Sequence, residues 1–342
     1  MRFPDALRSQ ARSCAALGSP FMGRLLMLLA DHMPLGTPLR DRIEGWPAPL
    51  GPSHASLPLR LAGGLHNLVL TGADPALAAV YPPHEADDAR LIRETLAALD
   101  RNQAFLLNWI DSPPQTNEVR RSAGLIPAAH VISARFSLPF VLSELGASGG
   151  LNLMFDRYGL QAGDATLGAQ DPVLTFTPDW QGPPPAATPF HVADRRGVDL
   201  TPMDLHDPAQ VTRLLSYLWP DQPERRALTR QAIGALQAPV DPGDAIDWLT
   251  TRLSAPRLGH VHVIFHTVAW QYFPEAVQDR GEALITEAGA RATDEAPLAR
   301  IAMEADDSDR RGAALTLQCW PDGERRELAR VDFHGRWIDW TG

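Results

Sequence analysis

The sequence predicts an α/β protein, in which a helical N-terminal region precedes a mostly parallel sheet that ends in an antiparallel hairpin. Apolar residues before about residue 130 recur at helical spacing, and two later runs are apolar and rich in β-branched residues. Near the C-terminus, an Asp-Gly turn separates two strand-like segments. We therefore expect a helical domain over residues 1–130 and an α/β domain over residues 131–342.

The N-terminal region is predicted to be helical because its apolar residues form one stripe on each segment. The longest helix is expected to start at about Ala86, and its apolar stripe consists of Ile92, Leu96, Leu99, Leu106 and Ile110. Shorter helices are expected over 5–17, 21–32 and 57–70. Prolines interrupt the gaps between these segments, as they do where helices end.

The strands expected after residue 138 belong to a sheet that is buried on both faces. Residues 138–145 and 261–268 are apolar and β-branched, and 298–303 is a weaker candidate. Helical stretches over 211–236 and 275–288 lie between them. Strands that alternate with helices indicate parallel pairing through right-handed crossovers.

The chain closes with strand-like segments over 313–320 and 327–340, joined through the turn Pro321-Asp-Gly-Glu324. Asp-Gly between two such runs is a strong hairpin signal. A section rich in proline and glycine, at about 161–190, is expected to form a loop-rich insertion in the α/β domain.

The composition limits the possible functions. A net charge of -10 argues against a dedicated nucleic-acid binder, which needs a basic surface. The sequence contains no lysine, which excludes P-loop and Schiff-base lysine chemistry. Cys14 and Cys319 form no CxxC, so we predict free thiols and no metal site. The apolar stretch 25–30 is too short for a membrane span, so we expect a cytoplasmic protein without a membrane partner.

The most informative stretch is 139–152, an apolar run that ends in Glu144 and continues into Gly146, Ser148 and Gly150. A buried strand that turns sharply into a helix beside a ligand has this pattern. Small residues let the backbone approach the ligand, and a helix N-terminus offers unpaired N–H groups. The same residues could also form only a tight helix–sheet contact.

Residues 146–150 also spell G-x-S-x-G, the nucleophile elbow of α/β-hydrolases. In that interpretation Ser148 is the nucleophile, and His266 or His334 is the base. The strand into an elbow should be apolar to its end, whereas this one ends in Glu144. A serine hydrolase is therefore the weaker alternative.

The acidic residue two positions before the first glycine resembles motif I of S-adenosylmethionine-dependent methyltransferases. Later segments follow in the matching order: Asp199 resembles the acid that accepts the ribose hydroxyls, and Asp244 the residue near the adenine. Residues 263–268 resemble the fourth strand of these enzymes, whose end faces the methyl group, which would place His266 beside the reaction centre. The resemblance covers about 138–340 and implies a Rossmann-type fold and S-adenosylmethionine as cofactor. The cofactor contacts that it implies are Glu144, Gly146, Ser148, Gly150, Asn152, Asp199 and Asp244. Asp199 and Asp244 also lie in turn-like sequences, where aspartate is common as a cap.

More specifically, residues 144–158 resemble a bacterial family catalogued as domain of unknown function 2332. Supporting matches run over nearly the whole chain, at 115–122, 219–222 and 266–272. We expect a methyltransferase acting on an unknown small molecule, with an unknown oligomeric state. The catalytic residues would be His266 and Tyr272, and the substrate contacts would be Asn117, Glu118 and Arg121. Asn117 could instead only cap the following helix. The first alternative is a non-catalytic, cofactor-binding sensor of the same fold.

Overall fold

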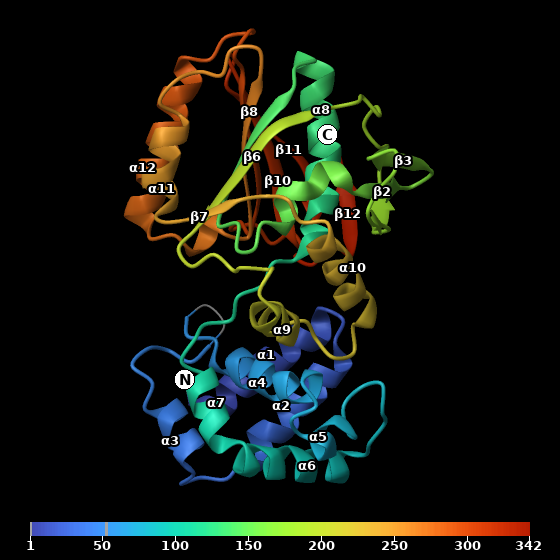
Figure 1. Cartoon of the computed structure of the whole chain (residues 1–342), viewed down its shortest axis with the longest axis vertical. Helices are drawn as coiled ribbons and strands as arrows, with labels where there is room; N and C mark the ends of the chain where they lie inside the picture. The colour runs from blue at the N-terminus through green and yellow to red at the C-terminus, as the bar shows by residue number, and fades with distance from the viewer. Residues whose placement is uncertain (1, 52–53) are drawn as a thin grey trace. The chain divides into compact units, whose positions relative to one another are not determined.

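The computed structural model describes residues 2–51 and 54–342 and divides into two compact units (Figure 1). The first unit comprises Met1–Thr116 and Asp204–Ala227, and the second comprises Asn117–Met203 and Leu228–Gly342. The first unit thus includes a segment from the second half of the chain. The sequence gives no local signal for this return, because it arises from packing between helices far apart in the chain.

The first unit is helical. Its helices are α1 (Phe3–Ala16), α2 (Pro20–His32), α3 (Pro38–Glu44), α4 (Leu57–Leu70), α5 (Pro75–Ala78), α6 (Asp88–Arg101), α7 (Gln103–Trp109) and α9 (Pro208–Ser216). Several begin with proline at the first turn, where its missing N–H costs nothing. The long stripe expected from Ala86 is divided between α6 and α7, because the helix ends at Asn102. The helix expected over 211–236 is likewise two helices, α9 and α10 (Pro223–Gly234).

The second unit contains a nine-stranded, mostly parallel sheet in the order β5-β12-β11-β10-β9-β8-β1-β6-β7. Its parallel part is β1 (Phe140–Leu145), β6 (Val192–Asp199), β7 (Val240–Pro242), β8 (Val261–Thr267) and β9 (Leu298–Glu304). The antiparallel part is β10 (Ala313–Trp320), β11 (Glu324–Val331) and β12 (Trp337–Trp340), with β5 (Asp179–Gln181) parallel to β12 at the edge. The expected mixed α/β class is confirmed. The expected hairpin is a three-stranded meander, because the chain turns again between β11 and β12.

The direction in which strands are added reverses at β1. From β1 the chain adds β6 and then β7 on one side, and it returns to add β8 and β9 on the other. The carboxyl ends of all five strands therefore lie at one edge of the sheet. In open α/β sheets, ligands bind outside this edge at the point of reversal.

Helices cover both faces of the sheet (Figure 1). On one face lies α8 (Ser122–Phe136), whose Gly124 packs against Leu315 of β10 and Val331 of β11. On the other face lie α11 (Ala245–Arg252) and α12 (Glu275–Ala290), which form an apolar core with the strands. Because strand side chains alternate between faces, neighbouring residues of β1 point to different helices.

The connection from β1 to β6 contains no α-helix. It runs through the 3₁₀ helix η2 (Leu151–Arg157) and a small sheet of β2 (Gly159–Ala162), β3 (Ala165–Gly168) and β4 (Thr175–Phe176). The section expected to be loop-rich, about 161–190, therefore carries β3 to β5 and half of β2. Within the part of the chain that the structure describes, no helix is both long and apolar enough to cross a membrane.

Candidate functional site

A pocket of about 280 Å³ lies at the carboxyl ends of the parallel strands in the second unit. Four of the residues predicted to contact a ligand line it: Gly146, Asp199, Asp244 and Tyr272. The rest of the wall is mainly apolar and consists of Val198, Leu200, Gly243, Ala245, Phe273, Pro274 and Val277. A mostly apolar wall with a few convergent polar groups is typical of small-molecule sites.

The turn after β1 has left-handed backbone at three positions, Gly146, Ser148 and Gly150, with φ values of +71°, +53° and +81°. A Cβ atom on Gly146 would lie 2.6 Å from Cβ of Ala269, and one on Gly150 would lie 2.9 Å from Cγ2 of Val240. Glycine is thus required at both positions for backbone and packing reasons. Gly146 brings the floor of the pocket against the segment that follows β8.

Asp199, the last residue of β6, ties the turn to its neighbouring strand. Its Oδ2 accepts a hydrogen bond from Ser148 N at 2.8 Å, and its Oδ1 accepts one from Thr201 N at 2.9 Å. The side chain is half-buried and lines the pocket. A carboxylate oxygen has two lone pairs, so each oxygen can accept a further bond from a ligand hydroxyl.

Asp244 is the N-cap of α11. Its Oδ1 accepts hydrogen bonds from Ile246 N at 2.9 Å and Asp247 N at 3.0 Å, which is the capping role that the sequence also allowed. The residue also lines the pocket. Because a single oxygen makes both capping bonds, capping leaves the second oxygen available to a ligand.

Glu144 lies on the face of the sheet opposite α11, because its neighbour Ser143 accepts a hydrogen bond from Arg252 of α11. Glu144 is 2% exposed, and no donor in the described part of the chain pairs with its Oε2. Burial and the nearby Asp199 raise the pKa of Glu144 well above its usual range, against the opposing charge of Arg121. The residue is not part of the pocket wall.

Asn117, Glu118 and Arg121 gather beside the turn in the same unit. Asn117 Oδ1 accepts a hydrogen bond from Leu151 N at 2.9 Å, and Ser122 Oγ donates to Asn152 Oδ1 at 2.7 Å. Glu118 is buried, and its Oε1 accepts a hydrogen bond from Arg120 N at 3.2 Å. These contacts hold the segment before α8 against η2.

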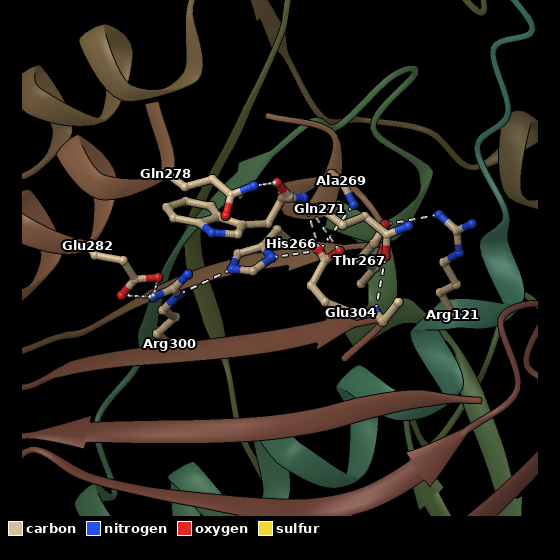
Figure 2. Close-up of polar contacts among 11 residues, drawn as sticks. Arg121, His266, Thr267, Ala269, Gln271, Gln278, Glu282, Arg300 and Glu304 are labelled. Carbon is tan, nitrogen blue, oxygen red and sulfur yellow. Dashed lines mark hydrogen bonds and ion pairs between the residues drawn. The ribbon is translucent and has the colours of Figure 1, made fainter. Parts of the chain in front are cut away.

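Arg121 connects this segment to the end of β8. It donates hydrogen bonds to the backbone oxygens of Thr267, at 2.9 Å, and Phe333, at 3.1 Å; the first is drawn in Figure 2. Neither Arg121 nor its neighbours Asn117 and Glu118 line the pocket.

His266 is buried in a polar network on the α11 and α12 face (Figure 2). Its Nδ1 donates to Glu304 Oε1 at 2.7 Å, and its Nε2 accepts from Arg300 Nε at 3.1 Å. Burial and the charge of Arg300 lower the pKa of His266, although Glu304 opposes them. Both ring nitrogens are thus occupied, and His266 is not among the residues of the pocket wall. Tyr272, by contrast, is 64% exposed and lines the pocket.

Two residues of this network, Arg300 and Glu304, did not emerge from the sequence. The signal was present in β9, where Arg300 and Glu304 lie four residues apart in an otherwise apolar strand. Charged residues at even spacing share one face of a strand. A buried strand with two charges on one face needs partners for both, and His266 lies between them.

A comparison with protein families identifies the relatives of the chain. A family model described as "Uncharacterized protein conserved in bacteria (DUF2332)" matches residues 4–340. The chain belongs to this family. The match includes both units and the connection from β1 to β6, which confirms the family resemblance seen in the sequence. No curated protein and no solved structure matches the chain.

Proposed function

We propose that this protein binds S-adenosylmethionine in the pocket beside Gly146 and transfers its methyl group to a small molecule. The observation that carries the proposal is the position of the pocket at the carboxyl ends of β1, β6 and β7, where the sheet order reverses. The strand order β7-β6-β1-β8-β9 is 3-2-1-4-5 in chain order of the parallel strands, which is that of doubly wound nucleotide-binding sheets.

The residues of the pocket fit the parts of this cofactor. Asp199 and Asp244 present acceptors for ribose hydroxyls and for the adenine amino group, and the apolar wall suits a flat ring. Gly146 lets the turn pack directly against Ala269 of the pocket wall, because any side chain there would collide with Ala269. Glu144, at the end of β1, has an Oε2 that pairs with no donor of the described residues, but it does not line the pocket, so its contact with the cofactor stays a prediction.

The cofactor supplies an activated methyl group, so the protein has mainly to position the acceptor and exclude water. Tyr272 extends from the pocket wall and is our candidate contact for the acceptor. His266 would have to give up a hydrogen bond before it could accept a proton, so its role as a base stays a prediction. A sensor without turnover would use the same pocket.

The geometry around Ser148 gives less support to a serine hydrolase. Its left-handed backbone suits an elbow, yet no residue in 2–51 or 54–342 makes a hydrogen bond to Ser148 Oγ. A serine nucleophile is activated by a base within hydrogen-bond distance. Labelling by a fluorophosphonate probe that is abolished in Ser148→Ala would favour the hydrolase.

Isothermal titration calorimetry with S-adenosylmethionine and S-adenosylhomocysteine tests the proposal. Asp244→Asn is the sharpest variant, because asparagine caps helices as well as aspartate does but replaces the second oxygen with a donor. We expect roughly tenfold weaker binding, the effect of one lost hydrogen bond, with unchanged thermal stability. Asp164→Asn, on an exposed turn between β2 and β3, is the matched control. Wild-type protein that binds neither compound would refute the proposal, and binding without turnover on an acceptor panel would favour the sensor.

A further inference from the structure

The segment that follows β8 forms one wall of the pocket and begins with a strained residue. Val268 has a φ of +53°, a conformation that is costly for a β-branched side chain. After it come Ala269 and the 3₁₀ helix η3 (Trp270–Tyr272), and then Phe273; Tyr272 and Phe273 line the pocket. Such a conformation persists only where the surrounding structure holds it in place.

The carboxylate of Glu304, at the end of β9, binds the start of this segment (Figure 2). Its Oε1 accepts hydrogen bonds from Ala269 N at 3.0 Å and Trp270 N at 3.1 Å, and its Oε2 accepts one from Gln271 N at 3.4 Å. Three consecutive backbone N–H groups thus point at one side chain. Hydrogen bonds from backbone donors to an ionised acceptor are among the stronger ones in proteins.

The neighbours of Glu304 keep its carboxyl group ionised. His266 donates to it through Nδ1 and accepts from Arg300, and Arg300 pairs with Glu282 of α12 at 2.7 Å. Trp270 stacks on His266, with ring centroids 5.0 Å apart, and so covers the pair. Burial acts to raise the pKa of Glu304, yet the hydrogen bonds from His266 and the backbone hold it below its ordinary value.

The position of residues 268–273 affects the pocket because Ala269 lies against the glycine turn. A Cβ on Gly146 would lie 2.6 Å from Cβ of Ala269, so no side chain fits between the turn and the segment. At its other end, Gln278 of α12 donates hydrogen bonds to the backbone oxygens of Trp270, at 3.1 Å, and Phe273, at 2.9 Å. The segment is therefore held at both ends, and Glu304 holds the end that touches the turn.

We propose that Glu304 is a positioning residue of the pocket: it holds residues 268–273 in their strained conformation, so that Ala269, Tyr272 and Phe273 form the wall. The identity of the ligand that this wall contacts depends on the proposed function. The positioning itself does not, because it concerns only hydrogen bonds within the second unit.

Amide hydrogen exchange of a peptide covering 266–273 tests this proposal without any ligand. Glu304→Gln keeps the shape of the side chain but turns one acceptor into a donor that faces a backbone N–H. We expect exchange in this peptide to become about tenfold faster, as one lost hydrogen bond implies. Glu282→Gln removes a carboxylate from the same network without touching the segment, so its exchange should match that of wild type.

A second pair of variants keeps the test decisive if Glu304→Gln does not fold. His266→Asn places an amide nitrogen where Nδ1 lies and keeps the donor to Glu304, whereas His266→Ala removes it. We expect His266→Asn to retain more protection in the peptide than His266→Ala. A folded Glu304→Gln variant with wild-type exchange, or equal exchange in the two His266 variants, would overturn the proposal.

Binding of S-adenosylhomocysteine separates this inference from the proposed function. If S-adenosylhomocysteine binds to wild type, Glu304→Gln should lower the affinity several-fold, and Glu282→Gln should leave the affinity unchanged. Equal affinities in wild type and both variants would count against a positioning role of Glu304. If wild type binds no S-adenosylhomocysteine, the proposed function fails. The exchange measurement still decides the role of Glu304.

Discussion

Glu144 and Glu304 are two carboxyl groups at the same edge of one sheet; Glu144 is buried, Glu304 is partly exposed, and they differ in their hydrogen bonds and in the direction of their pKa shifts. Glu144, on the α8 face, has an Oε2 that pairs with no donor of the described residues, and its pKa is raised. Glu304, on the α12 face, accepts four hydrogen bonds, and its pKa is lowered although burial opposes this. Burial acts to raise the pKa of both groups; the nearby Asp199 adds to this effect at Glu144, whereas the hydrogen bonds from His266 and the backbone outweigh it at Glu304.

This difference separates two roles. A carboxylate whose acceptors are all used stabilises the backbone around it, and removing it leaves buried donors without a partner. A neutral carboxyl group with an unused oxygen contributes little to the fold and can accept a ligand's donor or charge. We therefore propose that Glu304 holds the pocket wall, whereas a ligand contact of Glu144 stays a prediction, because Glu144 does not line the pocket.

The largest difference is expected in stability. Glu304→Ala leaves the N–H of His266 and three backbone N–H groups without an acceptor, and should lower the free energy of unfolding of the second unit by about 3 kcal/mol. Glu144→Gln replaces a carboxyl group whose Oε2 has no donor with an amide of the same shape, and it should change the free energy of unfolding by less than about 1 kcal/mol. Denaturant unfolding of both variants measures the two values, and equal losses would contradict the comparison.

The two groups should also give stability opposite pH dependences. Because the folded-state pKa of Glu144 is raised above its ordinary value of 4.5, its contribution is complete below pH 4.5 and is lost as the pH rises toward the raised pKa. Because the pKa of Glu304 is lowered from 4.5, its contribution is present above pH 4.5 and is lost as the pH falls through the lowered pKa.

Each of these titrations changes the free energy of unfolding by at most about 1.4 kcal/mol per pH unit. Unfolding of wild type, Glu144→Gln and Glu304→Gln across acidic and neutral pH checks the signs. The free energy of unfolding of Glu144→Gln should rise relative to that of wild type as the pH rises above 4.5. That of Glu304→Gln should approach the wild-type value as the pH falls below 4.5. Differences that run in the same direction for both variants would refute the assignment.

Proton release on binding sharpens the comparison further. If a cationic group of the ligand pairs with Glu144, this carboxyl group ionises and releases up to about one proton per ligand. Calorimetric titration in buffers of different ionisation enthalpy measures the number. We expect release by wild type and Glu304→Gln but not by Glu144→Gln; release that persists in Glu144→Gln would show that the proton comes from another group.

The smallest expected effect concerns the strained residue beside Glu304. Val268→Gly removes the steric cost of a positive φ but adds freedom to the unfolded chain. We expect a net gain of about 0.5 kcal/mol in the free energy of unfolding. Ser148→Gly, at the same φ beside Glu144, should gain less, because serine is not β-branched. A loss of stability in Val268→Gly would mean that the packing of Val268 outweighs its strain.

The sequence singled out Glu144 as a candidate site residue but gave no such indication for Glu304. Glu144, Gly146 and Gly150 are close in the chain, and their pattern of one acid and small residues after an apolar run is local. Glu304 binds backbone atoms 33 to 35 residues away and a histidine 38 residues away. Backbone donors carry no sequence signature, so only the fold reveals them.

The same distinction applies to the fold. The strands β1 and β8 were predicted because burial on both faces leaves a mainly apolar run in each, and β9, whose run contains Arg300, was the weaker candidate. The assignment of Asp204–Ala227 to the helical unit was not predicted, because it depends on packing between α4 and α9, which are more than a hundred residues apart.

A crystal structure of the protein with S-adenosylhomocysteine tests the central claim most directly. We predict that the ligand occupies the pocket between Asp199 and Asp244 and that the four hydrogen bonds of Glu304 are unchanged. A ligand bound elsewhere, or an empty pocket at saturating ligand concentration, would contradict this account.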